Sequence, residues 1–361
     1  MSTLATNAVR NCLRIQPEDN VTIFAFPHTL PLAEDLAVEC FKVGADALLN
    51  LYTDRYQDAY MKHLSVEQLR RPSAFCRGLS EISTATFWLG SLYDPALFRT
   101  WPAEKMVAND EGETDAHRPM RERKVRTLSL NIAQVTRPRA KTYGFNFAAW
   151  ERMVRAASAV PSKTLTTTGQ RLAGILGTSD ALHITAKGGT DLTVSVKGGQ
   201  PMINDGVVTD EKIAAGALDA SIPAGGVTVL PVATTAEGVV TCDVPQAWAG
   251  RTVRTIRWEF ENGRLTGFDG DAAAKMLRKQ WELSSGDRDR IAAVSFGLNP
   301  KARLGFLQNP IARGAVSVGI GSNEFYGGTN KSAFGFESTI RAATVEADGK
   351  PIVRDGKLLV P

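Results

Sequence analysis

The feature that most constrains the fold is a change of hydrophobic pattern near residue 178. Before it, apolar strand-like runs such as 21–26, 47–51, 86–90 and 125–130 alternate with helical segments. After it, period-two segments such as LHITA, LTVSV and VVTCDV dominate. Strands separated by helices favour a parallel sheet, whereas short alternating strands favour an antiparallel one. The sequence therefore predicts an α/β N-terminal domain with a mostly parallel sheet, and a β-rich α+β C-terminal domain.

We place the boundary between the domains at 177/178, which gives a 1–177 α/β domain with two bridging helices and a 178–361 β-rich domain. The bridging helices are predicted at 147–160 and 162–176. The segment 109–123 is polar and lacks apolar periodicity, so it is predicted to be a surface loop able to act as a lid. Asn262-Gly263 predicts a tight hairpin turn, because both residues accept positive φ.

Composition excludes several classes of function. Lys and Arg exceed Asp and Glu by 42 to 38, and these charges are dispersed, so no nucleic-acid partner is expected. No apolar run approaches the roughly 20 residues that cross a bilayer, and the N-terminus lacks a signal-peptide pattern. We expect a cytoplasmic protein with no membrane partner, which can form a homo-oligomer.

The commonest catalytic motifs are absent. The sequence contains no GxxxxGK[ST] loop, no HExxH, no GxSxG and no CxxC. These absences remove the usual nucleotide, zinc-protease, serine-hydrolase and redox interpretations. Only four histidines occur, and none follows His183.

The last third of the chain carries two informative stretches, IAAVSFGLNPKARLG and GAVSVGIGSNEFYGGTNKSAFGFESTIR. The first resembles the FGxNPxAR segment shared by aminopeptidase T-like enzymes and 2,5-dihydroxypyridine 5,6-dioxygenases, and the second resembles their GGxNxSxxHxD segment. GGTDLTVSV, WEFENGRLTGF and TRPRAKTYGFNFAAW add to this similarity. The resemblance covers the chain well from Thr136 to Arg341 and the N-terminal part more loosely. It implies a two-domain enzyme with a site for a small molecule in a cleft between the domains.

The resemblance also implies a metal, which carboxylates and histidines hold in the aminopeptidases, and two histidines with one carboxylate hold in the dioxygenases. Position by position, these ligands fall on Ala293, Ser317, Gly335, Glu337 and Gly226. Alanine and glycine carry no donor atom, and one carboxylate among neutral partners does not retain a transition metal against water. We therefore expect no metal site and no cofactor.

Several residues could still perform chemistry in such a site. Glu337 is the candidate general base or substrate anchor, with an ion pair to Arg341 or Arg303 as its structural alternative. Ser317 and His117, the latter in the predicted loop, are weaker catalytic candidates, each with a structural alternative as a space-filling or a solvated residue. The remaining candidates are polar or aromatic residues that could bind substrate and lie in the GGTNKS segment, just before its glycines, or in the TRPRA segment: Glu324, Tyr326, Asn330, Lys331, Ser332, Arg137 and Arg139.

Three functions stay open at this point. The first is a metal-independent hydrolase that opens or cleaves a small polar amide, lactam or nitrogen heterocycle, with the small molecule as its partner. The second is an iron-dependent ring-cleavage dioxygenase or a metallo-aminopeptidase with ligands from elsewhere in the chain. The third is a non-catalytic homologue that binds a small molecule.

Overall fold

The computed structural model of the chain describes residues 3–360 and divides into two compact units. The first unit contains the residues up to Phe147 together with Gly206–Pro223, and the second contains Ala148–Asp205 together with Ala224–Pro361. Each is described below by itself.

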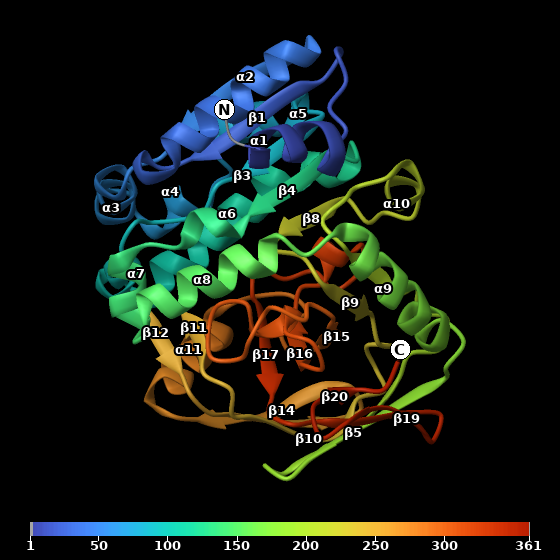
Figure 1. Cartoon of the computed structure of the whole chain (residues 1–361). Coiled ribbons are helices and arrows are strands. Elements are labelled where there is room, and N and C mark those ends of the chain that lie inside the picture. The colour runs from blue at the N-terminus through green and yellow to red at the C-terminus, as the bar shows by residue number, and fades with distance from the viewer. Residues whose placement is uncertain (1–2, 361) are drawn as a thin grey trace. The chain divides into compact units, whose positions relative to one another are not determined.

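The first unit is built on a five-stranded sheet in the order β2-β1-β3-β4-β8, in which every neighbouring pair is parallel. The strands are β1 (Asn20–Ala25), β2 (Asp46–Leu51), β3 (Ala85–Trp88), β4 (Arg126–Leu130) and β8 (Asp219–Ile222). The helices are α1 (Thr3–Asn7), α2 (Leu30–Val43), α3 (Asp54–His63), α4 (Val66–Arg70), α5 (Ala74–Ile82), α6 (Ala103–Glu122), α7 (Arg137–Tyr143) and α10 (Asp210–Ala214). Shorter helical turns are η1 (Ala8–Cys12), η2 (Pro27–Thr29), η3 (Pro95–Thr100) and η4 (Asn131–Gln134). The predicted parallel α/β architecture is confirmed (Figure 1).

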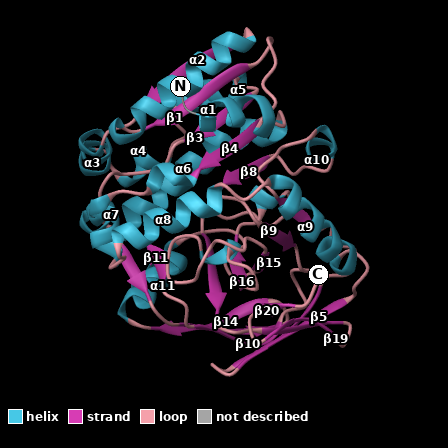
Figure 2. Cartoon of the chain, viewed as in Figure 1, coloured by secondary structure: helices cyan, strands magenta, loops and turns pink. Residues whose placement is uncertain are grey.

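The second unit consists mainly of antiparallel strands, as Figure 2 shows. One sheet has the order β14-β13-β10-β6-β5-β18-β19-β20, another has the order β17-β16-β15-β9-β7, and β11 pairs with β12. Its helices are α8 (Phe147–Ser158), α9 (Ser162–Leu176) and α11 (Ala272–Leu283), with the turns η5 (Asn309–Ile311) and η6 (Glu324–Tyr326). The strands of this unit up to Gly270 are β5 (Ala181–Ala186), β6 (Thr190–Ser195), β7 (Met202–Asn204), β9 (Gly226–Val229), β10 (Glu237–Cys242), β11 (Gln246–Trp248), β12 (Arg251–Val253), β13 (Ile256–Glu261) and β14 (Arg264–Gly270). The later strands are β15 (Ile291–Gly297), β16 (Val316–Gly321), β17 (Gly335–Ile340), β18 (Thr344–Ala347), β19 (Lys350–Arg354) and β20 (Lys357–Leu358).

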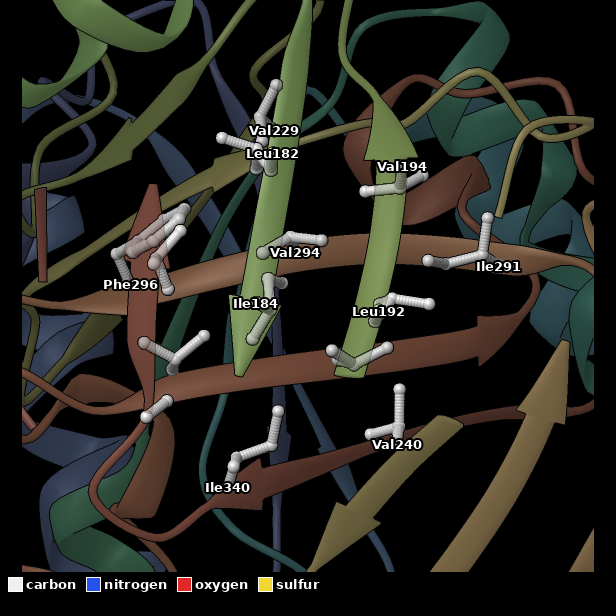
Figure 3. Close-up of a cluster of buried hydrophobic side chains, with 14 of the residues drawn as sticks. Leu182, Ile184, Leu192, Val194, Val229, Val240, Ile291, Val294, Phe296 and Ile340 are labelled. Carbon is white, nitrogen blue, oxygen red and sulfur yellow. The ribbon is translucent and has the colours of Figure 1, made fainter. Parts of the chain in front are cut away.

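The core of the second unit lies between its two large sheets. Figure 3 shows the strands of one sheet crossing those of the other, with Leu182 and Ile184 of β5 beside Val294 of β15. These side chains are fully buried, and Ile291, Phe296 and Ile340 belong to the same cluster. Burial of this apolar surface drives the sheets together. The predicted β-rich C-terminal region is confirmed, as is the hairpin at Asn262-Gly263, which joins β13 to β14.

The units divide at Phe147 rather than at the expected 177/178. Helix α9 packs on β7 and β9, and its Leu165, Leu172 and Leu176 enter the core of the second unit. The chain then returns to the first unit, where β8 pairs in parallel with β4. Local periodicity identified both bridging helices correctly, but long-range pairing decides the unit to which a segment belongs.

The predicted loop at 109–123 is wrong, because this segment lies in helix α6. The helix buries Ala108, Gly112, Ala116 and Met120, which are four residues apart and share one face. Three of these four residues are alanine or glycine, so a search for large apolar residues at helical spacing does not detect this buried face. Gly112 allows the close approach that the packing needs, because a Cβ there would lie 2.3 Å from the carbonyl oxygen of Leu69. Within residues 3–360, no helix is long and apolar enough to cross a lipid bilayer.

We predict opposite effects for alanine at two helical glycines. Gly112→Ala should lower the free energy of unfolding by about 1–3 kcal/mol, because α6 must shift away from the Leu69 carbonyl. Gly174→Ala in α9 meets no atom within 4 Å. It should raise the free energy of unfolding by about 0.4–1 kcal/mol, since alanine restricts the unfolded chain. Chemical denaturation of both variants checks this, and equal effects would contradict the close packing of α6.

Candidate active site

The sheet β17-β16-β15-β9-β7 has two chemically different faces, because successive side chains of a strand point in opposite directions. One face carries Val294, Phe296, Val316 and Val318, which belong to the core. Glu337 and the small or hydroxyl-bearing residues of β15 and β16 alternate with them and form the opposite face. Every residue of β15 and of β16 is buried. The second face is thus shielded from water although it contributes no large apolar side chain.

A row of four hydroxyl groups crosses this face. Thr228, Ser295, Ser317 and Thr339 are direct cross-strand partners on β9, β15, β16 and β17. The hydroxyl oxygens of Thr228 and Ser295 are 3.0 Å apart, and those of Ser317 and Thr339 are 2.8 Å apart. The row therefore consists of two hydrogen-bonded pairs. Ser317 has no histidine partner to activate it, so the structure offers no support for it as a nucleophile.

Glu337 lies in the next row of the same face, between small neighbours. Its cross-strand partner is Gly319, whose own partner on β15 is Ala293. The Tyr326 hydroxyl donates to Glu337 Oε2 at 3.3 Å. Oε1 is buried without a hydrogen bond of good geometry, although the Ser295 and Ser317 hydroxyls face the carboxylate. The carboxylate thus keeps one acceptor oxygen available in a shielded position.

Burial raises the pKa of Glu337 above the ordinary value for glutamate. The hydroxyl groups of Ser295, Tyr326 and Ser317 face the carboxylate and act in the opposite direction. Among residues 3–360, no ion pair joins Glu337 to an arginine, and Arg341 instead pairs with Asp243 at 3.3 Å. The predicted structural alternative, an ion pair of Glu337 with Arg341 or Arg303, is therefore not formed.

The segment between β16 and β17 is pinned beside this face by two asparagines. The Asn330 side-chain amide donates to the Ile291 carbonyl at 2.9 Å, and the Asn323 amide donates to the Ala292 carbonyl at 3.2 Å. The two residues are also joined, because the Asn330 backbone N–H donates to Asn323 Oδ1 at 2.8 Å. This cross-linking holds the η6 turn, and with it the Tyr326 hydroxyl, in place.

The sequence analysis did not identify Asn323. An asparagine directly after a strand is typical of side-chain-stabilised turns, so a signal for it was present.

The other residues of the GGTNKS segment make structural contacts. The Ser332 hydroxyl donates to the Ser285 carbonyl at 2.7 Å, and the Lys331 backbone N–H donates to Asp287 Oδ2 at 2.9 Å. The Lys331 side chain is exposed, and Glu324 is partly buried at the start of η6. A role in substrate binding stays a prediction for Glu324, Lys331 and Ser332.

His117 lies on α6 in the first unit, not on a loop. Its Nδ1 is 2.9 Å from the Glu113 carbonyl oxygen, and its ring lies 5.5 Å from that of Trp88 between ring centres. Its Nε2 is buried without a hydrogen-bond partner. Arg137 and Arg139 also belong to the first unit. The structure therefore places Glu337, Ser317 and Tyr326 in the second unit. It places His117, Arg137 and Arg139 in the first unit.

The positions that correspond to metal ligands do lie on one face. Ala293, Glu337 and Ser317 occupy two adjacent cross-strand rows, and Gly335 and Gly226 follow on the same face by the two-residue period.

The residues at these positions do not fit a catalytic transition metal. They provide one carboxylate, one hydroxyl and three side chains without a donor atom. In the described part of the chain, no group of three or more His, Cys, Asp and Glu side chains could hold a metal ion. Stable binding of zinc or iron needs three or four such ligands.

The chain belongs to the thermophilic metalloprotease family M29, whose family model matches residues 1–299. The match ends before β16 and β17, the strands that carry Ser317 and Glu337. No curated protein matches the chain.

Two solved structures share its fold. The wild-type AmpT from Thermus thermophilus is 20% identical with a TM-score of 0.69, and the match covers 99% of this chain and 98% of AmpT. The 2,5-dihydroxypyridine dioxygenase from Pseudomonas putida KT2440 is 15% identical with a TM-score of 0.62, and the match covers 96% of this chain and 94% of the dioxygenase.

The raised pKa of Glu337 predicts how the stability of the Glu337→Gln variant depends on pH. A carboxyl group whose pKa is higher in the folded state binds protons more tightly there. Wild-type stability therefore falls as pH rises from the ordinary pKa of glutamate through the raised value. Glutamine does not titrate. The variant should therefore gain stability relative to wild type across this pH range, measured as melting temperature, and a difference independent of pH would contradict the shift.

Proposed function

We propose that this member of the M29 family is a metal-independent hydrolase that cleaves a carbon–nitrogen bond in a small amide, lactam or nitrogen heterocycle. The observation that carries the proposal is Glu337 Oε1, a buried carboxylate oxygen that faces the Ser295 and Ser317 hydroxyls without forming a hydrogen bond of good geometry. Leaving such an acceptor unsatisfied costs free energy, so its retention favours a role with a ligand or a water molecule. Family membership supports hydrolysis, and the unsuitable donor set supports a mechanism without a metal.

Glu337 would act as a general base and then as a general acid. Oε1 accepts a proton from a water molecule while the water oxygen forms a bond to the substrate carbonyl carbon. The carbonyl electron pair moves to its oxygen. When this pair returns, the carbon–nitrogen bond breaks, and Glu337 gives its proton to the leaving nitrogen. The pKa of a base works best near the operating pH, and burial moves the pKa of Glu337 in that direction.

Tyr326 positions this base. Because its hydroxyl donates to Oε2, the carboxylate is held in one orientation with Oε1 available. The neighbours of Glu337 on this face are the small residues Ala293, Gly319 and Gly335. A Cβ added at Gly319 or at Gly335 would meet no atom closer than 3.7 Å, so neither glycine is in close backbone contact. The burial of the carboxylate oxygen favours a small substrate over a polypeptide.

We predict that Glu337→Gln lowers turnover by about 100- to 10,000-fold, the usual contribution of general base catalysis, while the fold is retained. A panel of small amides, lactams and heterocyclic amides identifies a substrate first, and kcat and circular dichroism are then compared. The wild-type rate should rise with pH through the raised pKa of Glu337. Glu282→Gln, which removes an exposed carboxylate on α11, is the matched control. Near-wild-type turnover of the Glu337 variant would remove this residue from the mechanism.

We also predict that activity survives chelation. Protein purified without added metal should contain much less than one equivalent of zinc, iron or manganese, because its site lacks the ligands. Elemental analysis before and after dialysis against a chelator measures this content alongside the rate. A stoichiometric metal that is lost together with activity would instead support a metallo-aminopeptidase or a dioxygenase.

A further inference from the structure

The first unit contains a second place where ligand binding is favoured, the carboxyl edge of its parallel sheet. In the order β2-β1-β3-β4-β8, the chain passes from β1 to β2 on one side and later from β3 to β4 on the other. The loops that leave the carboxyl ends of β1 and β3 therefore run in opposite directions, away from the border between these two strands. In open α/β sheets, ligands bind outside the carboxyl ends of the strands at such a point.

Side chains from three loops meet at this edge. His28 lies in the η2 turn after β1, Tyr93 follows β3, and Arg139 lies on α7 after β4. The rings of His28 and Tyr93 are 5.3 Å apart between centres. The Arg139 Nη2 donates to the Leu92 carbonyl, and the Thr136 hydroxyl donates to the Tyr93 carbonyl at 2.9 Å. These contacts connect the loops after β3 and β4.

Arg139 is a buried cation that forms no ion pair with a carboxylate of the described residues, although the charges of Asp54 and Asp94 act on it from a distance. The residue is 4% exposed, and its Nε is buried without an acceptor. The neighbouring acids are already engaged. Asp54 accepts the backbone N–H groups of Tyr93 and Asp94, while Asp94 accepts from Ala96 N–H and from the Thr142 hydroxyl. Burying a guanidinium without a direct ion pair costs free energy, which an anionic ligand would offset.

His28 adds a second polar group that is not fully paired. Both of its ring nitrogens are buried without a hydrogen bond of good geometry, although the Ala133 carbonyl lies near the ring. Burial lowers the pKa of His28, and the positive charge of Arg139 lowers it further, whereas Asp54 and the Ala133 carbonyl act in the opposite direction. The imidazole is therefore neutral near pH 7 and offers one N–H donor.

We propose that Arg139 and His28 form a binding site for a small oxyanion, either a carboxylate or a phosphate, at the carboxyl edge of the first unit's sheet. Arg139 supplies the charge and a donor at Nε, and His28 supplies a neutral N–H donor from the opposite loop. Arg137 does not take part, because it is exposed and its guanidinium lies 4.5 Å above the Phe147 ring. The site rests on the first unit alone and does not depend on the reaction proposed for Glu337.

Calorimetric titration of the full chain tests the site with three probes: benzoate, inorganic phosphate and the neutral analogue benzamide. One of the two anions should bind and benzamide should not. Arg139→Met should weaken the binding by about 10- to 100-fold, as expected for a charge-assisted hydrogen bond. Lys141→Met, which removes an exposed cation from the same helix, should leave it unchanged. Benzoate binding assigns a carboxylate ligand, and phosphate binding alone assigns a phosphate ligand.

Nuclear magnetic resonance of the four histidines gives a second readout. A bound anion favours the imidazolium form, so the pKa of His28 should rise on addition of the anion, while the resonances of His63, His117 and His183 report any general effect of salt. If Arg139→Met fails to fold, His28→Gln keeps the Arg139 contact with Leu92 and should weaken binding as well. Absence of binding by both anions, or binding that neither substitution reduces, would overturn the proposal.

Discussion

The antiparallel register of β9, β15, β16 and β17 is the constraint on which the candidate active site depends. Because this register pairs residues directly across the strands, it collects large apolar side chains on one face and the hydroxyls with Glu337 on the other. The first face is held by the core it shares with the eight-stranded sheet. A slip by one residue would exchange the two faces and bury Glu337 in that core. The packing that stabilises the second unit therefore also orients its carboxylate.

Unsatisfied polar groups occur in both units and in similar settings. Glu337 Oε1, the two ring nitrogens of His28 and Arg139 Nε are all buried without a hydrogen bond of good geometry. By contrast, Asn299 and Asn330 are buried with their amides fully engaged to backbone groups. Glu337, His28 and Arg139 are the residues for which we propose ligands, whereas the two asparagines hold loops in place. Sequence motifs alone do not make the distinction, because both kinds of residue occur in the same conspicuous segments.

Predictions from the local sequence pattern were correct where the residues of one segment are sufficient to specify its secondary structure. The parallel strands, the bridging helices and the Asn262-Gly263 hairpin follow from periodicity and turn chemistry, and the structure confirms them. Helix α6 was missed because Ala108, Gly112 and Ala116 make its buried stripe from small side chains, which pack closely only when a neighbouring helix is present. The assignment of α9 and β8 to their units likewise depended on partners distant in sequence.

The sequence by itself determined which atoms this protein can use. It contains no histidine after residue 183, so no folding of the second unit can supply imidazole from the later strands. The tertiary structure decided how the remaining groups behave. The cross-strand register brings Ser317 and Ser295 to Glu337, the asparagine contacts of the η6 turn bring Tyr326 to it, and burial raises the pKa of that carboxyl group. The reason is physical: donor atoms are a property of each residue, whereas pairing and desolvation are properties of its surroundings.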